Sequence, residues 1–373
     1  MKKVLIFSLA YYPHVGGAEV AIKEITDRIS DIEFHMVTMR FSSHDPAEEK
    51  VGAIHVHRVG LGSSYLAKIL FIPRAALVAR TLHAKERFGG AWAMMSYMLL
   101  PLVLMRLMGA SIPYAVTLQE GDTYEHMFAR LRILPFMPFL RSGFAHATAV
   151  SALSTFLAQW AKGMGYKGSV EVVPNGADIQ KFTPPEGWAS GTKIAHQGTV
   201  LITSSRLVHK NAVDDIIRAL PLVPEVTLKV AGVGQDEQML KALAQELGVS
   251  ERIEWLGYVG HNTLPALLWA ADIYIRPSRS EGFGASFPEA MAAGLPVITT
   301  QEGGLKDYIT SDVAWPVKKD SPKEIAMQIK AILSNLEATK EVTERARTMV
   351  AGKYDWSLIA RDMREKVFSR LFV

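Results

Sequence analysis

The 373-residue sequence contains no cysteine. That absence excludes disulfide scaffolds, thiolate zinc sites, iron–sulfur clusters and cysteine nucleophiles. Hydrophobic residues make up 49% of the chain and charged residues 21%, which is the composition of a globular protein and excludes a disordered or fibrous one. A chain without thiols is compatible with the cytoplasm, which is the compartment we expect.

Long hydrophobic runs are absent as well. The most apolar stretch, residues 91–105, contains Pro101 and falls short of the roughly 20 residues that a membrane span requires. Residues 4–10 are apolar, but no small-residue cleavage site follows them, so a buried first strand fits better than a signal peptide. We therefore expect a soluble protein, or one held peripherally at the inner face of a membrane.

Net charge is low and unevenly distributed. The whole chain carries +4, whereas residues 1–175 hold 18 Lys and Arg against 13 Asp and Glu, a net +5. A positive first half suits an anionic surface or a phosphate-bearing partner. We expect no nucleic-acid partner.

What the sequence does contain is an alternation of short apolar runs with helix-length amphipathic segments. This alternation is typical of parallel sheets that are covered by helices on both faces. It occurs on either side of a proline- and glycine-containing segment, residues 182–197, which we interpret as a linker. The sequence therefore predicts an α/β fold of two Rossmann-like, doubly wound domains that face each other across a cleft, at residues 1–180 and 181–355.

The segment richest in candidate chemistry spans residues 276–298. A predicted strand ends near Ser278, a loop with Gly282 and Gly284 follows, and a helix begins near Phe287. Ligands of open α/β sheets bind beyond such strand ends, where helix N-termini present free N–H groups to anions. We therefore expect a ligand site here.

Two carboxylates, Glu281 and Glu289, flank this turn. Ser286 and Glu289 also fit a Ser-x-x-Glu capping box, so Glu289 has a purely structural alternative. Glu281 lies in the loop without a capping partner, and we interpret it as a ligand-binding residue.

The two-glutamate segment resembles the signature of GT-B retaining glycosyltransferases, in particular the nucleotide-sugar-dependent family 4 type, or group 1. Five further segments match motifs of this family in the same order. Residues 12–19 resemble its N-terminal glycine loop, residues 173–178 its interdomain Pro-Asn-Gly-x-Asp, and residues 205–210 its Arg…Lys phosphate motif. Residues 230–234 and 256–259 resemble its next two strand ends. The resemblance implies a GT-B fold. Its first domain would bind the acceptor, its second the nucleotide sugar, and residues 356–373 would form a helix that crosses back to the first domain.

The activity implied by the resemblance is transfer of a hexosyl group from a UDP- or GDP-linked sugar to a hydroxyl of a glycan or lipid-linked acceptor, with the anomeric configuration retained. Negative charge builds on the leaving diphosphate, and fixed cations can stabilise it in a water-poor site. Arg206 and Lys210 resemble the family's diphosphate-binding pair, and a solvated basic turn is the alternative. The sequence has no Asp-x-Asp pair, so we expect neither a metal nor another cofactor.

The other donor-side roles are likewise implied by the resemblance. Glu281 resembles the acid that binds hydroxyls of the donor sugar, and Glu289 the acid that holds the ribose, because a carboxylate can accept two hydroxyl protons. The remaining residues that we expect around the phosphate, the nucleobase and the sugar are Gly16, Gly17, Tyr258, Val259, Gly282, Phe283 and Gly284.

One departure from the family concerns the acceptor side. Many relatives carry a histidine after the strand that we predict at residues 114–118, and Gln119 occupies that position here. Glu120 or Asp122 is a candidate to bind or deprotonate the acceptor hydroxyl. A metal site made from this acidic loop is a weaker alternative, because acidic loop residues are usually only solvated. A donor phosphate oxygen can also serve as the base.

Residues 128–141 combine three arginines with three phenylalanines. Such a basic amphipathic stretch can lie on an anionic bilayer and bring the enzyme to a lipid-linked acceptor. The alternative is a partly buried helix pair with outward-pointing arginines. His55 and His57 alternate on a predicted strand, and we interpret them as surface or core residues.

Other protein classes share parts of this pattern. A dinucleotide-dependent dehydrogenase requires Gly-x-Gly-x-x-Gly after the first strand, and residues 11–17 do not contain it. A non-catalytic sugar-nucleotide-binding protein remains an alternative, although the cation pair and both glutamates are present. A nucleotide-sugar epimerase and a pyridoxal-dependent phosphorylase of the same fold are further alternatives.

Overall fold

A computed structural model describes residues 1–186 and 198–372 of the chain. The chain divides into two compact units, of which the first comprises Met1–Asn175 and Trp356–Val373 and the second Gly176–Asp355. The boundary expected after residue 180 therefore falls after Asn175, and the C-terminal segment belongs to the first unit. Most of the linker predicted at residues 182–197 lies outside the described residues.

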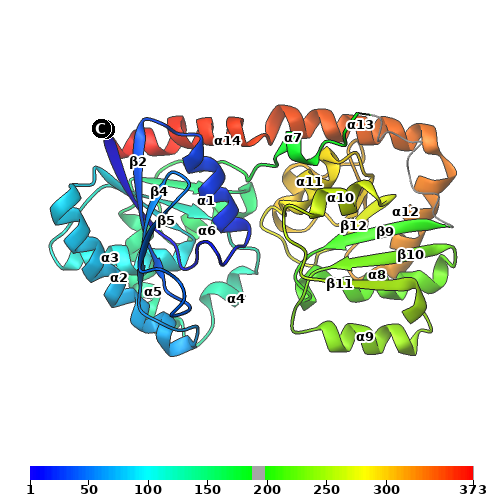
Figure 1. Cartoon of the computed structure of the whole chain (residues 1–373), viewed down its shortest axis with the longest axis horizontal. Helices are drawn as coiled ribbons and strands as arrows, with labels where there is room; N and C mark the ends of the chain where they lie inside the picture. The colour runs from blue at the N-terminus through cyan, green and yellow to red at the C-terminus, as the bar shows by residue number, and fades with distance from the viewer. Residues whose placement is uncertain (187–197, 373) are drawn as a thin grey trace. The chain divides into compact units, whose positions relative to one another are not determined.

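The first unit is built on one sheet with the strand order β3-β4-β2-β1-β5-β6-β7-β8. Every pair of neighbouring strands is parallel except β3 with β4. The direction of strand progression reverses between β1 and β5 (Figure 1), as in a doubly wound sheet. The strands are β1 (Lys2–Phe7), β2 (Ile32–Met39), β3 (Glu48–Val51), β4 (Ile54–Val59), β5 (Gly90–Met94), β6 (Tyr114–Leu118), β7 (Ala149–Ala152) and β8 (Val170–Val172).

Helices connect these strands. They are α1 (Gly17–Asp27), α2 (Tyr65–Glu86), α3 (Leu99–Leu107), α4 (Tyr124–Phe128), α5 (Met137–Ala145), α6 (Thr155–Gly163) and the C-terminal α14 (Trp356–Asp362). The apolar run at residues 91–105 is shared between strand β5 and helix α3, because a continuous apolar run does not by itself distinguish a buried strand from a buried helix. Within the described residues, no helix is both long and apolar enough to cross a bilayer.

The second unit repeats the same architecture with the strand order β11-β10-β9-β12-β13-β14, and all its pairs are parallel. The order reverses between β9 and β12. Its strands are β9 (Thr199–Ser204), β10 (Val226–Ala231), β11 (Ile253–Gly257), β12 (Ile273–Arg276), β13 (Val297–Thr299) and β14 (Trp315–Pro316). Its helices are α7 (Ile179–Phe182), α8 (Val213–Ala219), α9 (Glu237–Glu246), α10 (Leu264–Trp269), α11 (Ser286–Ala292), α12 (Pro322–Ser334) and α13 (Leu336–Lys353). The two parallel-sheet units confirm the predicted α/β fold class.

The C-terminal segment completes the core of the first unit. Helix α14 lies against α1 (Figure 1), and the chain continues through Met363–Val367 and Phe368–Phe372. The ring of Phe368 is fully buried, 5.9 Å from the ring of Phe34 on β2 and 5.1 Å from that of Trp92 on β5. Segments about 300 residues apart in the chain thus share one core.

Replacing Phe368 by alanine tests this contribution. Removing a fully buried phenylalanine costs about 3–5 kcal/mol, so we expect Phe368→Ala to lower the free energy of unfolding of the first unit by that amount. Phe139→Ala is the control, because this ring is 46% exposed and surface changes usually stay within about 0.5 kcal/mol. Urea denaturation measures both, and equal losses would contradict a core role for the C-terminal segment.

Candidate donor-binding and catalytic site

Two loops leave the sheet of the second unit where its strand order reverses. The loop after β9 carries Arg206, which is exposed, and the half-buried Lys210 in a short 3-10 turn. The loop after β12 carries Glu281. The backbone N–H of Arg279 donates to the carbonyl oxygen of Lys210 at 2.7 Å, so the two loops are tied to each other. Ligands of open α/β sheets bind at this position, beyond the carboxyl ends of the strands at the switch point.

A pocket of about 260 Å³ lies beside these loops. Its lining comes from the carboxyl ends of β9, β10 and β11 and from the start of α10 and α11. Of the predicted residues it includes Arg206, Tyr258, Val259 and Glu289. The complete lining is Ser204, Ser205, Arg206, Ala231, Gly232, Val233, Tyr258, Val259, Leu264, Ser286 and Glu289.

Glycine is required at the back of this pocket. Gly232 has a φ of +150°, and a Cβ atom built there would lie 1.8 Å from the carbonyl oxygen of Ser205. The loops after β9 and β10 can approach this closely only without a side chain at position 232. The sequence motif at residues 230–234 therefore has a steric explanation.

Glu281 is held by a buried arginine that the sequence analysis missed. Its Oε2 forms an ion pair with Arg276, and the side chains are 9% and 11% exposed. Arg276 also donates to the hydroxyl of Ser286 at 2.9 Å and to the amide oxygen of Asn211 at 3.2 Å. Burial lowers the pKa of Arg276, but Glu281 together with Tyr274 and Tyr308 raises it, and the pKa lies above its usual value. The guanidinium therefore fixes the orientation of Glu281.

The second carboxylate oxygen of Glu281 accepts a hydrogen bond from an uncharged backbone group instead of forming an ion pair. Its Oε1 accepts the N–H of Gly282 at 3.1 Å. A carboxylate oxygen has room for more than one donor, so this atom can also accept a sugar hydroxyl. The signal that the sequence offered for Arg276 was a charged residue at the end of an otherwise apolar strand.

Glu289 is oriented by a second contact chain. Its Oε1 lies 2.9 Å from Nε2 of His261, and Nδ1 of the same ring lies 3.1 Å from Nζ of Lys181. A lysine ammonium only donates, so Nδ1 is the acceptor and Nε2 carries the hydrogen that is donated to Glu289. Neither His261 nor Lys181 was identified from the sequence.

The capping-box alternative for Glu289 does not form. Helix α11 begins at Ser286 itself, and its N-cap residue, Ala285, has no side-chain hydrogen bond. The Ser286 hydroxyl instead accepts from Arg276 and lies 2.7 Å from the hydroxyl of Tyr274. Glu289 is therefore available for the pocket that it lines.

The three residues after Glu281 form and anchor the loop that carries it. Phe283 is buried, its ring lies near those of Tyr308 and Tyr354, and its carbonyl oxygen accepts the Tyr308 hydroxyl at 2.7 Å. Gly282 is buried and Gly284 has a φ of +76°. The contacts of Phe283 anchor the loop. The roles of Gly282, Phe283 and Gly284 in donor binding stay predictions.

The candidate residues of the first unit lie on loops after β1 and β6. Gly16 and Gly17 are exposed at the start of α1, where the Gly16 N–H donates to the Glu19 carboxylate at 2.7 Å, and a Cβ at Gly17 would meet nothing within 4 Å. After β6, the side-chain amides of Gln119 and Asn175 bond reciprocally at 3.1 and 3.3 Å. Their part in binding donor or acceptor stays a prediction.

Glu120 is buried rather than presented at the surface. The residue is 1% exposed, and Oε1 of its side chain accepts the backbone N–H of Ser96 at 2.7 Å. Oε2 is buried and has no hydrogen-bond partner among the described residues. Burial raises the pKa of Glu120 above its usual value. Asp122, two residues on, is half-buried.

Comparisons with known proteins identify the family of this chain. Residues 16–176 match the family model for the glycosyl transferase 4-like domain, and residues 188–349 match that for glycosyl transferases group 1. The fold and site define a GT-B glycosyltransferase. The chain belongs to the group 1 glycosyltransferases, as the sequence resemblance predicted.

Individual relatives are distant. An uncharacterized glycosyltransferase of Methanocaldococcus jannaschii is 30% identical over 204 residues, which cover 52% of each chain. A GDP-mannose-dependent alpha-(1-6)-phosphatidylinositol monomannoside mannosyltransferase of Mycobacterium tuberculosis is 24% identical over 98% of both chains. Matches to the first curated relatives span about half the length of those proteins.

Solved structures share the fold. An Anabaena protein, HepE, in complex with UDP and glucose superposes with a TM-score of 0.80, at 19% identity, over 99% of this chain and 100% of its own. At this level of identity the similarity establishes the fold.

The buried carboxyl group of Glu120 predicts a pH-dependent stability. Because its pKa is raised, the folded state holds this proton more tightly than the unfolded chain, so the free energy of unfolding falls as pH rises above the usual pKa of a glutamate. Glu120→Gln removes this penalty and keeps an acceptor for Ser96. We expect the Tm of the variant to exceed that of the wild type at pH 8 and the difference to shrink toward pH 5.

Each kcal/mol of this difference corresponds to roughly 2–4 °C in Tm for a unit of this size. Glu125→Gln, a change at an exposed position of the short helix α4 that follows this loop, is the matched control and should leave the pH dependence unchanged. Parallel Tm-against-pH curves for Glu120→Gln and wild type would contradict the raised pKa.

Proposed function

We propose that this glycosyltransferase moves a hexosyl group from a UDP- or GDP-linked sugar to a hydroxyl of a glycan or lipid-linked acceptor, with retention and without a metal ion. The observation that carries the proposal is the pocket after β9–β11, which holds the Arg206 cation, the Glu289 carboxylate and the exposed Tyr258. These groups match the phosphate, the ribose and the base of a nucleotide, respectively.

Arg206 and Lys210 provide the main electrostatic stabilisation of the leaving group. Cleavage of the donor leaves a nucleoside diphosphate, whose new negative charge must be stabilised in the transition state. Arg206 and Lys210 lie on one loop at the switch point, and the Arg279 N–H holds that loop against the catalytic loop. Fixed cations of this kind make a divalent ion unnecessary for the leaving group.

The two carboxylates orient the donor. Glu281 would accept hydroxyls of the sugar through Oε1, since Arg276 occupies Oε2. Glu289 would accept a ribose hydroxyl through Oε2, since His261 engages Oε1. Each glutamate thus has one oxygen held by a cationic or N–H partner and one with remaining acceptor capacity.

The transfer balances without a protein nucleophile. The bond between the anomeric carbon and the diphosphate oxygen breaks, and the acceptor oxygen bonds to that carbon on the same face. The acceptor proton passes to an oxygen of the leaving diphosphate. Gln119 and Asp122 would position the acceptor, while Glu120, through its bond to Ser96, supports the loop that carries them.

The first test is turnover with a panel of UDP- and GDP-linked hexoses in the presence of EDTA, measured as release of nucleoside diphosphate. We expect Glu281→Gln to lower kcat by about 100-fold or more, because a group aimed at the reacting sugar acts in the transition state. The rise in Tm on adding the matching nucleoside diphosphate should persist, because Arg206 and Glu289 are unchanged.

Glu337→Gln, on an exposed position of α13, is the matched control. Retained binding with lost turnover separates a catalytic effect from unfolding, which matters because the variant leaves Arg276 without its ion partner. Wild-type turnover by Glu281→Gln would refute the role of Glu281. Activity that requires a divalent ion would refute the metal-free mechanism.

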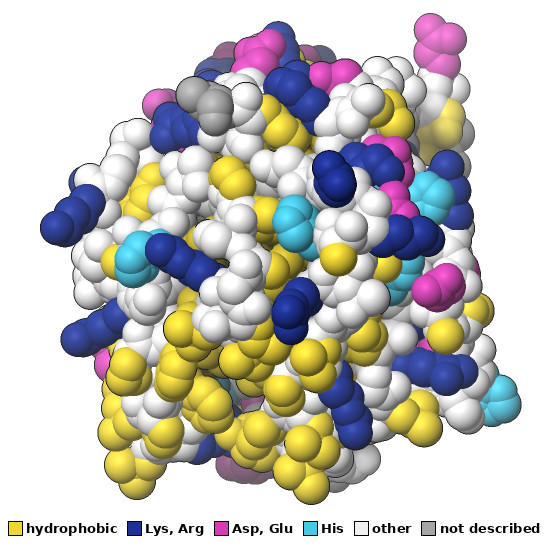
Figure 2. Space-filling view, turned by 90° about the vertical axis from the view of Figure 1, so that its left-hand side faces the viewer, with side chains coloured by type: hydrophobic (Ala, Val, Ile, Leu, Met, Phe, Trp, Pro, Cys, Tyr) yellow, Lys and Arg dark blue, Asp and Glu magenta, His cyan; other side chains and the backbone are white. Residues whose placement is uncertain are grey.

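We further propose that the first unit meets an anionic membrane. Leu66 on α2 is 63% exposed and Leu131 is 86% exposed. The guanidinium of Arg132 lies 5.3 Å from the ring centre of Tyr65, so the start of α2 and the 130–136 segment are neighbours. Figure 2 shows hydrophobic side chains gathered over part of this unit, with Lys and Arg around them.

The exposure of Leu131 favours a surface role over the alternative of a partly buried helix pair. The basic side chains of this surface suit anionic headgroups, and the leucines suit the acyl boundary. The mycobacterial relative is described as acting on a phosphatidylinositol monomannoside, which is a membrane lipid. We call this surface, made by Tyr65, Leu66, Leu70, Leu131, Leu134, Phe139, Lys68, Arg130, Arg132 and Arg141, the apolar–basic face.

Flotation with vesicles that contain phosphatidylglycerol tests the apolar–basic face. We expect binding at low salt, weakened by high salt, and reduced about tenfold or more by the double change Leu66→Asp and Leu131→Asp, since burial of one leucine is worth roughly 1.5–3 kcal/mol. Leu336→Asp, at a leucine of the second unit that is 72% exposed, is the control. Absence of binding at low salt, or equal loss in the control, would contradict the proposal.

A further inference from the structure

Histidine and glutamate side chains gather on one face of the first unit's sheet. Glu33 and His35 lie on β2, and His55 and His57 lie on β4. His35 is directly opposite His55 in the parallel register, and Glu48 of β3 is opposite His57. The residues between them, such as Phe34 and Ile54, enter the core on the other face of the sheet.

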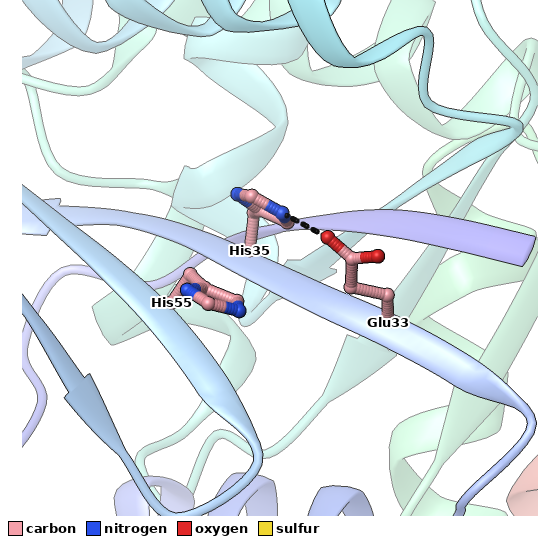
Figure 3. Close-up of side chains that lie close together, drawn as sticks. All are labelled: Glu33, His35 and His55. Atoms are coloured by element: carbon pink, nitrogen blue, oxygen red, sulfur yellow. Dashed lines mark hydrogen bonds and ion pairs between the residues drawn. The ribbon is translucent and has the colours of Figure 1, made fainter. Parts of the chain in front are cut away.

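These side chains form a continuous chain of contacts. Oε1 of Glu33 lies 2.8 Å from Nε2 of His35, and Nδ1 of His35 lies 3.3 Å from Nε2 of His57. Nδ1 of His57 lies 3.2 Å from Oε1 of Glu48. The His55 ring stacks on the His35 ring with centres 4.8 Å apart. Figure 3 shows the side chains of Glu33, His35 and His55 close together, with the contact between Glu33 and His35 drawn as a dashed line.

The contact chain lacks one hydrogen. It has three contacts, each of which needs a hydrogen, and the two carboxylates supply none. Two neutral imidazoles carry one N–H each, so one contact has no hydrogen. If Glu48 takes the Nδ1–H of His57, then His57 Nε2 takes the Nδ1–H of His35. The bare Nε2 of His35 is then directed at Oε1 of Glu33.

Two lone-pair atoms at 2.8 Å repel each other unless a cation lies beside both. Lys3 compensates in part, since its Nζ is 3.3 Å from the same oxygen of Glu33, but it is also bound to Glu86 at 2.7 Å. Among the described residues, Lys3 forms no ion pair with a histidine ring. In this arrangement the Nε2 lone pair of His35 is available to a cation. In the reverse arrangement, with hydrogen on Nε2 of both rings, the contact without a hydrogen is the one between His57 and the 76% exposed side chain of Glu48.

We propose that Glu33, His35 and His55 bind a divalent transition-metal ion of the zinc class, with water completing the coordination. Two imidazole nitrogens and one carboxylate oxygen are a ligand set that Zn²⁺ takes in proteins. Glu48 and His57 act as outer partners, because a ligating histidine donates its other ring N–H to a hydrogen-bond acceptor that fixes its tautomer.

The geometry needs only small movements. The candidate ligand atoms of the three residues all lie within 4.8 Å of one another, whereas two ligands of one tetrahedral Zn²⁺ are about 3.3 Å apart. Buried His35 is the fixed member, and Glu33 and His55 reach solvent and can rotate toward it. Their exposure also provides the entry path that a metal site requires.

The position of the cluster on the sheet assigns a structural rather than a catalytic role to the proposed ion. Glu33 and His35 are the second and fourth residues of the eight-residue β2, in its amino-terminal half. Ligands that react on open α/β sheets bind at the opposite, carboxyl ends. An ion held by both β2 and β4 would cross-link the edge of this sheet.

The test uses metal-stripped protein without a histidine tag. Titration with Co²⁺, followed by its visible absorption, and with Zn²⁺, followed by calorimetry, should give one ion per chain. We expect His55→Gln and Glu33→Gln each to weaken binding at least tenfold. His44→Gln, a change at an exposed histidine of the loop before β3, is the matched control and should leave binding unchanged.

Circular dichroism in chelator checks that the variants stay folded. His55→Gln is the safer of the two because His55 forms no ion pair within the described part of the chain, whereas Glu33 pairs with Lys3 and His35. Zn²⁺ should raise the Tm of the wild type but not that of His55→Gln. Turnover should be unaffected by either change, so this test is independent of the proposed activity. Failure to bind one ion, or binding that both variants retain, would overturn the proposal. The hydrogen that the contact chain lacks would then be supplied by a proton on the histidine pair.

Discussion

The candidate site of the second unit depends on the buried ion pair between Arg276 and Glu281. Taking a guanidinium and a carboxylate out of water is costly unless each has its partner and further hydrogen bonds. Arg276 meets this condition by bonding three different segments: Glu281 in the glycine loop, Ser286 at the start of α11 and Asn211 after β9. One cation at the end of β12 therefore sets the relative positions of the loops on both sides of the switch point.

The same principle recurs at Glu289. His261 and Lys181 orient this carboxylate by a relay that leaves one of its oxygens with acceptor capacity. In both cases a glutamate presents one oxygen to the ligand side while a charged or N–H partner holds the other. Preorganisation of this kind lets a site stabilise charge without rearranging during the reaction. It also explains why the loops are rich in glycine, since Gly232 permits the close approach that forms the pocket.

The two sheets use their ends differently. In the second unit the carboxyl ends of the strands carry the ligand pocket. In the first unit the carboxyl end of β6 leads to the buried Glu120, while the amino-terminal half of β2 and the facing β4 carry the histidine–glutamate cluster. The C-terminal segment adds Phe368 to the core on the other face of β2. The core contacts and the histidine–glutamate cluster of the first unit thus occupy opposite faces of one sheet.

The sequence alone determined the fold class, the family and the order of the motifs, because these depend on local patterns: apolar strands, amphipathic helices and glycine turns at fixed offsets. It also placed Glu281 and Arg206 at strand ends. It did not reveal Arg276, His261 or Lys181 as partners of the two glutamates, since Lys181 and His261 are 80 residues apart and meet only through the fold.

Tertiary structure likewise decided which polar residues are buried. Glu120 resembles a solvated loop acid in the sequence but is 1% exposed, and His35 and His55 become neighbours only through the register of β2 with β4. Burial and strand register arise from packing between distant segments, and no local pattern encodes them. Side-chain chemistry along the chain therefore determined what the site is made of, and packing decided how its charges are paired.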